Sequence, residues 1–167
     1  FFWAKFTNNG NFANFQAILL GSDQGRKVYT KKLINLVERY NLNKKVKFIN
    51  HCKEMPLAYS LADVVVSASI EPEAFGRVAV EAQSMRKPIV ASNIGGSKET
   101  ILNKKSGFLY KHDDPRELAK SLNTVIQLNQ DELNSMGNEG RKNITKKFDV
   151  DIMCDSNLKE YKKLLKN

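Results

Sequence analysis

The sequence has few cysteine, proline and glycine residues. Its two cysteines, Cys52 and Cys154, are too few for a disulfide scaffold and lie too far apart for a zinc motif. We therefore expect reduced thiols and a cytoplasmic location. With 4 prolines and 9 glycines in 167 residues, collagen-like and low-complexity chains are excluded. No apolar run approaches the ~18 residues of a membrane span.

Positive charge is present in excess, with 27 Lys and Arg against 18 Asp and Glu and a net charge of +9. Much of the excess falls in residues 22–62. Such a distribution favours an acidic partner, which could be nucleic acid, anionic lipid or a phosphorylated substrate. The alternative is a set of solvated helix faces. Because lysine greatly outnumbers arginine, the residue preferred for reading base edges, we do not expect a nucleic-acid partner.

Short apolar runs alternate with longer segments of helical periodicity. Strands are predicted at 15–20, 46–49, 63–67, 88–92 and 107–110, and helices at 26–40, 57–61, 76–85 and 115–166. We expect the last helical region to break near Phe148-Asp149. The order Asp114, Pro115 and Glu117 is typical of a helix start with an aspartate N-cap. Residues Phe1 to Phe6 read as the end of a helix.

Strands without strict polar alternation, separated by helices, predict a parallel sheet covered on both faces. The fold class is therefore α/β, a doubly wound Rossmann-like sheet, and residues 1–167 form a single domain. Such sheets bind ligands beyond the carboxyl ends of their strands. The candidate site lies in the loops after Leu20, Ile49, Ser69 and Ser92.

The loop that follows the third predicted strand carries the chemically informative residues. Gly76 stands where this loop turns into a helix, and helix N-termini bind anions through free backbone N–H groups. Glu73 precedes this point and Glu81 follows it, and ionised carboxylates accept hydrogen bonds from hydroxyl pairs. Together they fit a nucleotide sugar. The alternative is that Glu73 only favours the helix dipole and Glu81 is solvated, although Glu81 lies in the apolar run 78–82.

The run from Glu73 to Glu81 resembles the Glu-x7-Glu motif, with Phe-Gly after the first Glu, of retaining glycosyltransferases of family four (group 1). Further similar blocks follow the family's order at 19–26, 61–67, 88–92, 95–96, 99–101, 106–109 and 114–115. The resemblance implies the nucleotide-sugar-binding, C-terminal half of a GT-B fold. It also implies that the first strand of this half and the acceptor-binding N-terminal domain are missing.

On matching positions, the resemblance implies that Glu73 is the catalytic residue and holds hydroxyls of the transferred sugar. Glu81 would bind the ribose hydroxyls. The other donor-binding positions would be the backbone of Ala74, Phe75, Gly76 and Arg77, the glycine turn at Gly21, and His51 beside the base. For His51, an exposed loop histidine is the alternative.

The implied activity is transfer of a hexose from a nucleotide sugar to a cell-envelope glycan or glycolipid, with retention and without a bound metal or other cofactor. The acceptor would meet the missing N-terminal domain. The basic segments would suit docking on the anionic inner face of the membrane. The alternative is a non-catalytic remnant of a split gene that acts as a nucleotide-binding module, and we expect the isolated chain to be inactive.

Overall fold

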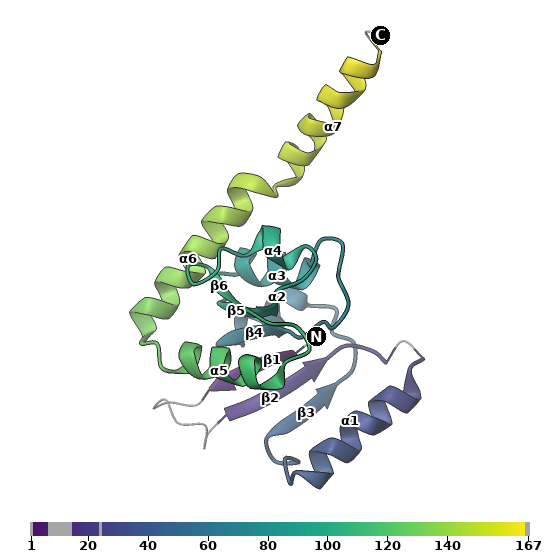
Figure 1. Ribbon diagram of the computed structural model, residues 1–167, viewed down its shortest axis with the longest axis vertical. Helices are drawn as coiled ribbons and strands as arrows, with labels where there is room; N and C mark the ends of the chain where they lie inside the picture. Colours follow the sequence, from purple (N-terminus) through teal and green to yellow (C-terminus); the bar gives the residue numbers. More distant parts are fainter. Residues whose placement is uncertain (1, 7–14, 24, 166–167) are drawn as a thin grey trace.

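The computed structural model describes residues 2–6, 15–23 and 25–165, which form a six-stranded sheet with helices on both faces (Figure 1). The strands are β1 (Phe2–Phe6), β2 (Phe15–Leu20), β3 (Val46–Ile49), β4 (Val64–Ser67), β5 (Ile89–Ser92) and β6 (Gly107–Tyr110). Their order across the sheet is β3-β2-β1-β4-β5-β6. Five of these strands run parallel to one another, as predicted, and β1 runs antiparallel to both of its neighbours.

The helices are α1 (Lys27–Arg39), α2 (Met55–Ser60), α3 (Arg77–Ser84), α4 (Ser97–Thr100), α5 (Pro115–Ile126), α6 (Gln130–Lys147) and α7 (Val150–Leu164). The sequence predicted helical structure at all of these positions except the four-residue α4, but it did not predict the break between α5 and α6. The Asp114 side chain accepts hydrogen bonds from the backbone N–H groups of Arg116 and Glu117, so the predicted helix cap is confirmed. The predicted break after α6 is also confirmed at Phe148.

The core lies around β4 and β5, in which every residue is buried. Side chains of successive strand residues point to opposite faces of a sheet. Accordingly, Val65 packs on one face with side chains of α2 and α3, whereas Val64 packs on the other face with side chains of α5. A continuous run of apolar residues is what a strand buried on both faces requires.

The first strand departs from the sequence prediction. The helical end predicted for Phe1 to Phe6 is wrong, because Phe2–Phe6 pair with β2 and the first three of these residues also pair with β4. Phe1 lies outside the described residues. A helix here would leave backbone groups of both neighbouring strands unpaired, at a free-energy cost comparable to lost hydrogen bonds. The strand is antiparallel, so it fills the central position without being the parallel first strand of the implied fold.

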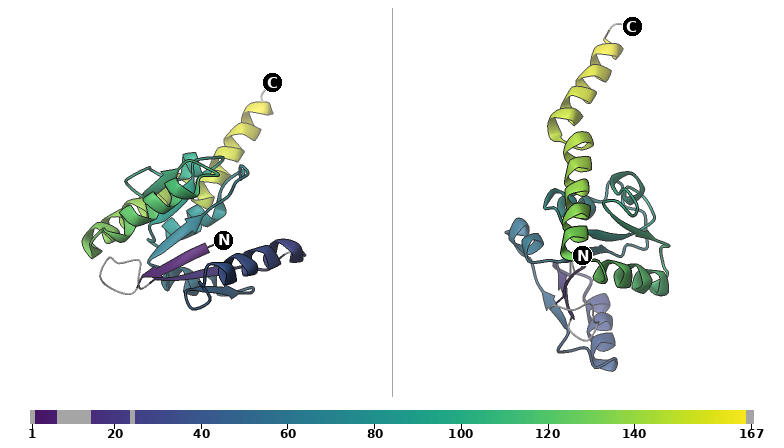
Figure 2. Two further views of the ribbon diagram at one scale, coloured as in Figure 1. Left: turned by 60° about the horizontal axis from the view of Figure 1, so that its bottom comes forward. Right: turned by 90° about the vertical axis from the view of Figure 1, so that its left-hand side faces the viewer.

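Helices α6 and α7 form a long rod that extends away from the sheet (Figures 1 and 2). The base of this rod packs against α3 and the turn after it, where Gly140 of α6 lies against Gln83 and Gly137 lies against the backbone of Arg86. By contrast, α7 has no buried residue. Within the described part of the chain, no helix is both long and apolar enough to cross a membrane.

The α3–α6 contact predicts a specific loss of stability. A Cβ at Gly137 would lie 2.1 Å from the backbone oxygen of Arg86. Alanine normally stabilises a helix by ~1 kcal/mol relative to glycine, but this clash is with backbone and forces α6 away from the turn that follows α3. We expect Gly137→Ala to lower the free energy of unfolding by about 1–3 kcal/mol. Urea unfolding followed by circular dichroism measures the change.

The matched control is Asn138→Ala on the exposed side of the same helix, which should not lower stability. A Gly137→Ala variant as stable as the wild type would contradict the close packing of α6 on the turn that follows α3.

Candidate functional site

The five parallel strands end at one edge of the sheet, and the predicted site loops begin there. The loops 21–26, 50–54, 68–76 and 93–96 follow β2, β3, β4 and β5, respectively. In doubly wound sheets this carboxyl edge is where ligands bind. The predicted location of the site therefore coincides with a single edge of the structure.

Gly76 is the N-cap of α3 and adopts the left-handed conformation, with φ of +73°. Because residues with a side chain rarely adopt this conformation, glycine suits the turn by which the loop enters the helix. The N-terminus of α3 then presents backbone N–H groups and the positive end of the helix dipole. This is the predicted anion-binding element, and the structure places it between Glu73 and Glu81.

The loop 73–76 rests directly on the loop that follows β5. The Gly96 N–H donates a hydrogen bond of 2.9 Å to the Glu73 carbonyl oxygen. A Cβ at Gly95 would lie 2.3 Å from that oxygen, and a Cβ at Gly96 would lie 2.5 Å from the Phe75 carbonyl. Only glycine permits this contact, so the two glycines fix the path of the loop.

Glu73 lies exposed in this loop. One of its carboxylate oxygens, Oε1, accepts a hydrogen bond from the Ser69 hydroxyl. Ala74 and Phe75 are exposed as well, whereas Gly76 is buried. An exposed carboxylate held at one oxygen retains acceptor capacity for the hydroxyl groups of a ligand.

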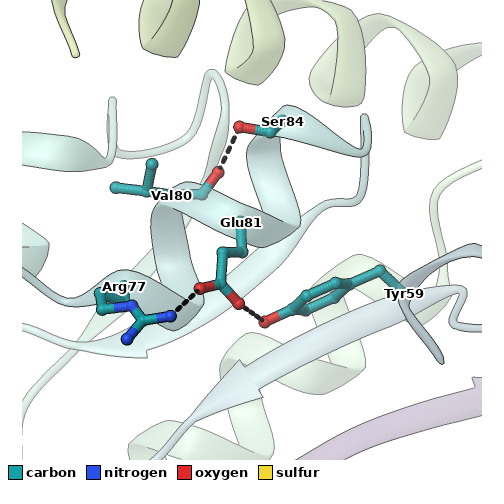
Figure 3. Close-up of polar contacts among 5 residues, drawn as sticks. All are labelled: Tyr59, Arg77, Val80, Glu81 and Ser84. Atoms are coloured by element: carbon teal, nitrogen blue, oxygen red, sulfur yellow. Dashed lines mark hydrogen bonds and ion pairs between the residues drawn. The ribbon is translucent and has the colours of Figure 1, made fainter. Parts of the chain in front are cut away.

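Glu81 occupies a different environment, on the first turns of α3. Its side chain is 36% exposed and accepts two hydrogen bonds (Figure 3). The Tyr59 hydroxyl donates to Oε2 at 2.9 Å, and the Arg77 guanidinium donates to Oε1 at 3.1 Å. Burial and the hydrogen bond to Glu81 together raise the pKa of the Tyr59 phenol far above its usual value. Glu81 is thus neither fully solvated nor buried without partners.

Phe75 joins the loop to the C-terminal helices. Its ring, 44% exposed, meets the Phe148 ring edge to face, with 5.7 Å between the centroids. Phe148 ends α6 immediately before the break to α7. The side chain of Arg77 points outward and is 84% exposed.

Gly21 and His51 lie on the same edge of the sheet but on the other side of β1 from the loop 73–76. The Gly21 N–H donates to the Ile49 carbonyl oxygen at 3.0 Å, which joins the ends of β2 and β3. His51 follows β3 and is exposed. The structure therefore groups these two residues with each other, apart from Glu73 and Glu81.

Several residues that shape the site were not predicted from the sequence. Tyr59 lies in an apolar helix 22 positions before the carboxylate that it contacts, and Phe148 contacts the loop from the end of α6. Neither contact has a short-range sequence signal. Ser69 is the exception, because a hydroxyl four residues before Glu73 in a loop is within reach of its side chain.

The described residues contain no group of three or more His, Cys, Asp or Glu side chains that could hold a metal ion. The sequence contains one Asp-x-Asp motif, Asp149-Val150-Asp151. Its first side chain accepts a hydrogen bond from the Asp151 N–H as the N-cap of α7. The role that the structure gives Asp149 is therefore helix capping.

These features define a doubly wound α/β domain whose candidate site is a helix N-terminus flanked by two carboxylates. Similarity to known proteins shows the family to which the chain belongs. A model of the family "Glycosyl transferases group 1" matches residues 4–143, so the chain belongs to this family. The predicted family is confirmed at this level.

Individual glycosyltransferases show the same similarity. A glycosyltransferase from Rickettsia africae matches with 31% identity and a TM-score of 0.85, over 90% of this chain and 40% of its own. Anabaena HepE, solved with UDP, matches with 31% identity and a TM-score of 0.82, over 87% of this chain and 40% of its own. The predicted fold, the C-terminal half of a GT-B glycosyltransferase, is therefore confirmed.

Among curated proteins, the capsular polysaccharide biosynthesis glycosyltransferase CapM of Staphylococcus aureus is 29% identical over 125 residues. This alignment covers 74% of the present chain and 32% of CapM. The chain thus spans about a third of the length of this relative and two fifths of the matched structures.

Proposed function

We propose that this chain is the donor-binding domain of a retaining glycosyltransferase of family four that uses a nucleoside-diphosphate sugar. The observation that carries the proposal is the glycine-capped N-terminus of α3, with Glu73 before it and Glu81 in its second turn. HepE was solved with UDP and also with UDP-glucose, which supports a donor of this class.

In this proposal, the diphosphate lies at the N-terminus of α3, where backbone N–H groups of the loop 74–77 stabilise the charge that develops on the leaving group. Glu73 accepts hydrogen bonds from hydroxyls of the transferred hexose. Glu81 accepts them from the ribose, and His51 borders the base. The departing phosphate then helps to remove the acceptor proton, and the product retains its anomeric configuration. No step requires a bound metal.

We further propose that the acceptor is a cell-envelope glycan or glycolipid, which the similarity to a capsular polysaccharide enzyme supports. Acceptor recognition would belong to a second domain outside these 167 residues. Accordingly, we expect no sugar transfer by the chain alone.

Nucleotide binding provides the first test. We expect the chain to bind UDP or GDP in calorimetric titrations. The substitution Glu81→Ala should lower the affinity for whichever nucleotide binds more tightly. Hydrogen bonds to a charged acceptor contribute about 1.5–3 kcal/mol, so the loss should be on the order of 10- to 150-fold. Glu139→Ala removes a similarly exposed helix glutamate of α6 and should leave affinity unchanged.

Absence of binding at millimolar UDP and GDP would contradict the donor site. Unchanged affinity in Glu81→Ala would remove the ribose role of Glu81. The alternative of a nucleotide-binding remnant is distinguished by a transfer assay after addition of an acceptor domain from a relative. Restored transfer supports the enzyme, and nucleotide binding without transfer supports the remnant.

A membrane-facing surface is the second part of the proposal. Helix α1 turns its half-buried residues Thr30, Leu33 and Val37 toward the rest of the protein. Its outer side carries exposed Lys31, Lys32 and the apolar side chain of Val28. A basic helix with exposed apolar residues suits the surface of anionic lipid. An enzyme that modifies a glycolipid would gain from this location.

Vesicle sedimentation tests this surface. We expect the chain to bind anionic vesicles more strongly than neutral ones. Each basic residue near an anionic surface contributes ~1 kcal/mol, so the double variant Lys31→Glu, Lys32→Glu should reduce binding by a factor on the order of ten or more.

Lys104→Glu, Lys105→Glu is the matched control, because this exposed pair precedes β6 at the opposite edge of the sheet. Equal binding to anionic and neutral vesicles, or equal losses in both double variants, would contradict a specific role for α1.

A further inference from the structure

The carboxylate of Glu81 has two partners of very different character (Figure 3). Tyr59, from α2, is 2% exposed, and its ring belongs to the hydrophobic core beneath α3. Arg77, from the first turn of α3, has a side chain that is 84% exposed. One oxygen of Glu81 is therefore held from inside the protein, and the other is paired at the surface.

The contact with Tyr59 is rigid because the core fixes the ring. A buried hydroxyl must be hydrogen-bonded to avoid a desolvation cost, and its partner here is Oε2 of Glu81 at 2.9 Å. The phenol stays protonated, since both burial and Glu81 raise its pKa. Tyr59 is thus a permanent donor that determines the direction of the carboxylate plane.

The contact with Arg77 is exchangeable. It is an i,i+4 ion pair on the surface of a helix, where water competes for both groups and the net stabilisation is small. An ionised carboxylate has about four acceptor positions. A ligand with two adjacent hydroxyls can therefore bind at Oε1 and the outward side of the carboxylate without disturbing the buried bond to Tyr59.

We propose that Tyr59 is a positioning residue, which holds the Glu81 carboxylate in the orientation that accepts a vicinal diol at the N-terminal half of α3. In the absence of ligand, Arg77 occupies the oxygen that the diol takes. The inference rests on the proposed function only in assigning that diol to the ribose of the nucleotide.

The test compares UDP with 2′,3′-dideoxy-UDP, which lacks the ribose diol. Tyr59→Phe keeps the ring in the core and removes only the hydroxyl. We expect this variant to bind UDP about three- to tenfold more weakly and to bind the dideoxy nucleotide with wild-type affinity. Glu81→Ala should show the same pattern with a larger effect. Ligand-observed NMR titrations measure both affinities.

Tyr110→Phe is the matched control. Tyr110 is also buried, and its hydroxyl accepts a hydrogen bond from Ser92 instead of contacting Glu81. This variant should bind both nucleotides as the wild type does. Urea unfolding of all variants shows whether each one is folded under the titration conditions.

The outcomes separate the two proposals. The positioning role is overturned if Tyr59→Phe lowers the affinities for UDP and dideoxy-UDP equally, or lowers neither. The ribose role of Glu81 stands in both cases. Equal effects of Glu81→Ala on both nucleotides overturn the ribose assignment itself, and the inference falls with it.

Discussion

The burial of β4 and β5 on both faces is the constraint on which the rest of this structure depends. All eight side chains of these strands are buried, so helices must cover the sheet on both sides. Helix α3 packs on one face, and α5 packs on the other. The loops that leave the two strands are consequently fixed at their starting points. The glycines after β5 then hold the loop after β4 by direct backbone contact.

This constraint gives Glu73 and Glu81 different environments, although only eight positions separate them in the sequence. Glu73 lies in the exposed loop, with a local hydroxyl as its partner. Glu81 reaches the boundary of the core, where Tyr59 can donate to it from below. Within this short motif, the exposed Glu73 carboxylate can change its orientation, whereas the Glu81 carboxylate is held by Tyr59. The difference arises from packing, since the residue type is the same.

Much of the fold could be predicted from the sequence because its strongest signals are local. Continuous apolar runs gave the strands at 64–67 and 89–92, and Asp114 with Pro115 gave the start of α5. The strand at Phe2–Phe6 could not be predicted in this way. Its conformation is determined by pairing with Val64–Val66, about sixty residues later in the chain. The same limit applies to the site. The spacing of the two glutamates could be predicted from the sequence, whereas the contact between Tyr59 and Glu81 could not.

The ring contact between Phe75 and Phe148 has a mechanical consequence. Helix α7 has 15 residues and no buried side chain, which makes it an unsupported arm about 22 Å long at 1.5 Å per residue. The arm begins two residues after Phe148, whose ring touches the loop that carries Glu73. The Phe75–Phe148 contact therefore ties the position of the break between α6 and α7 to the position of this loop.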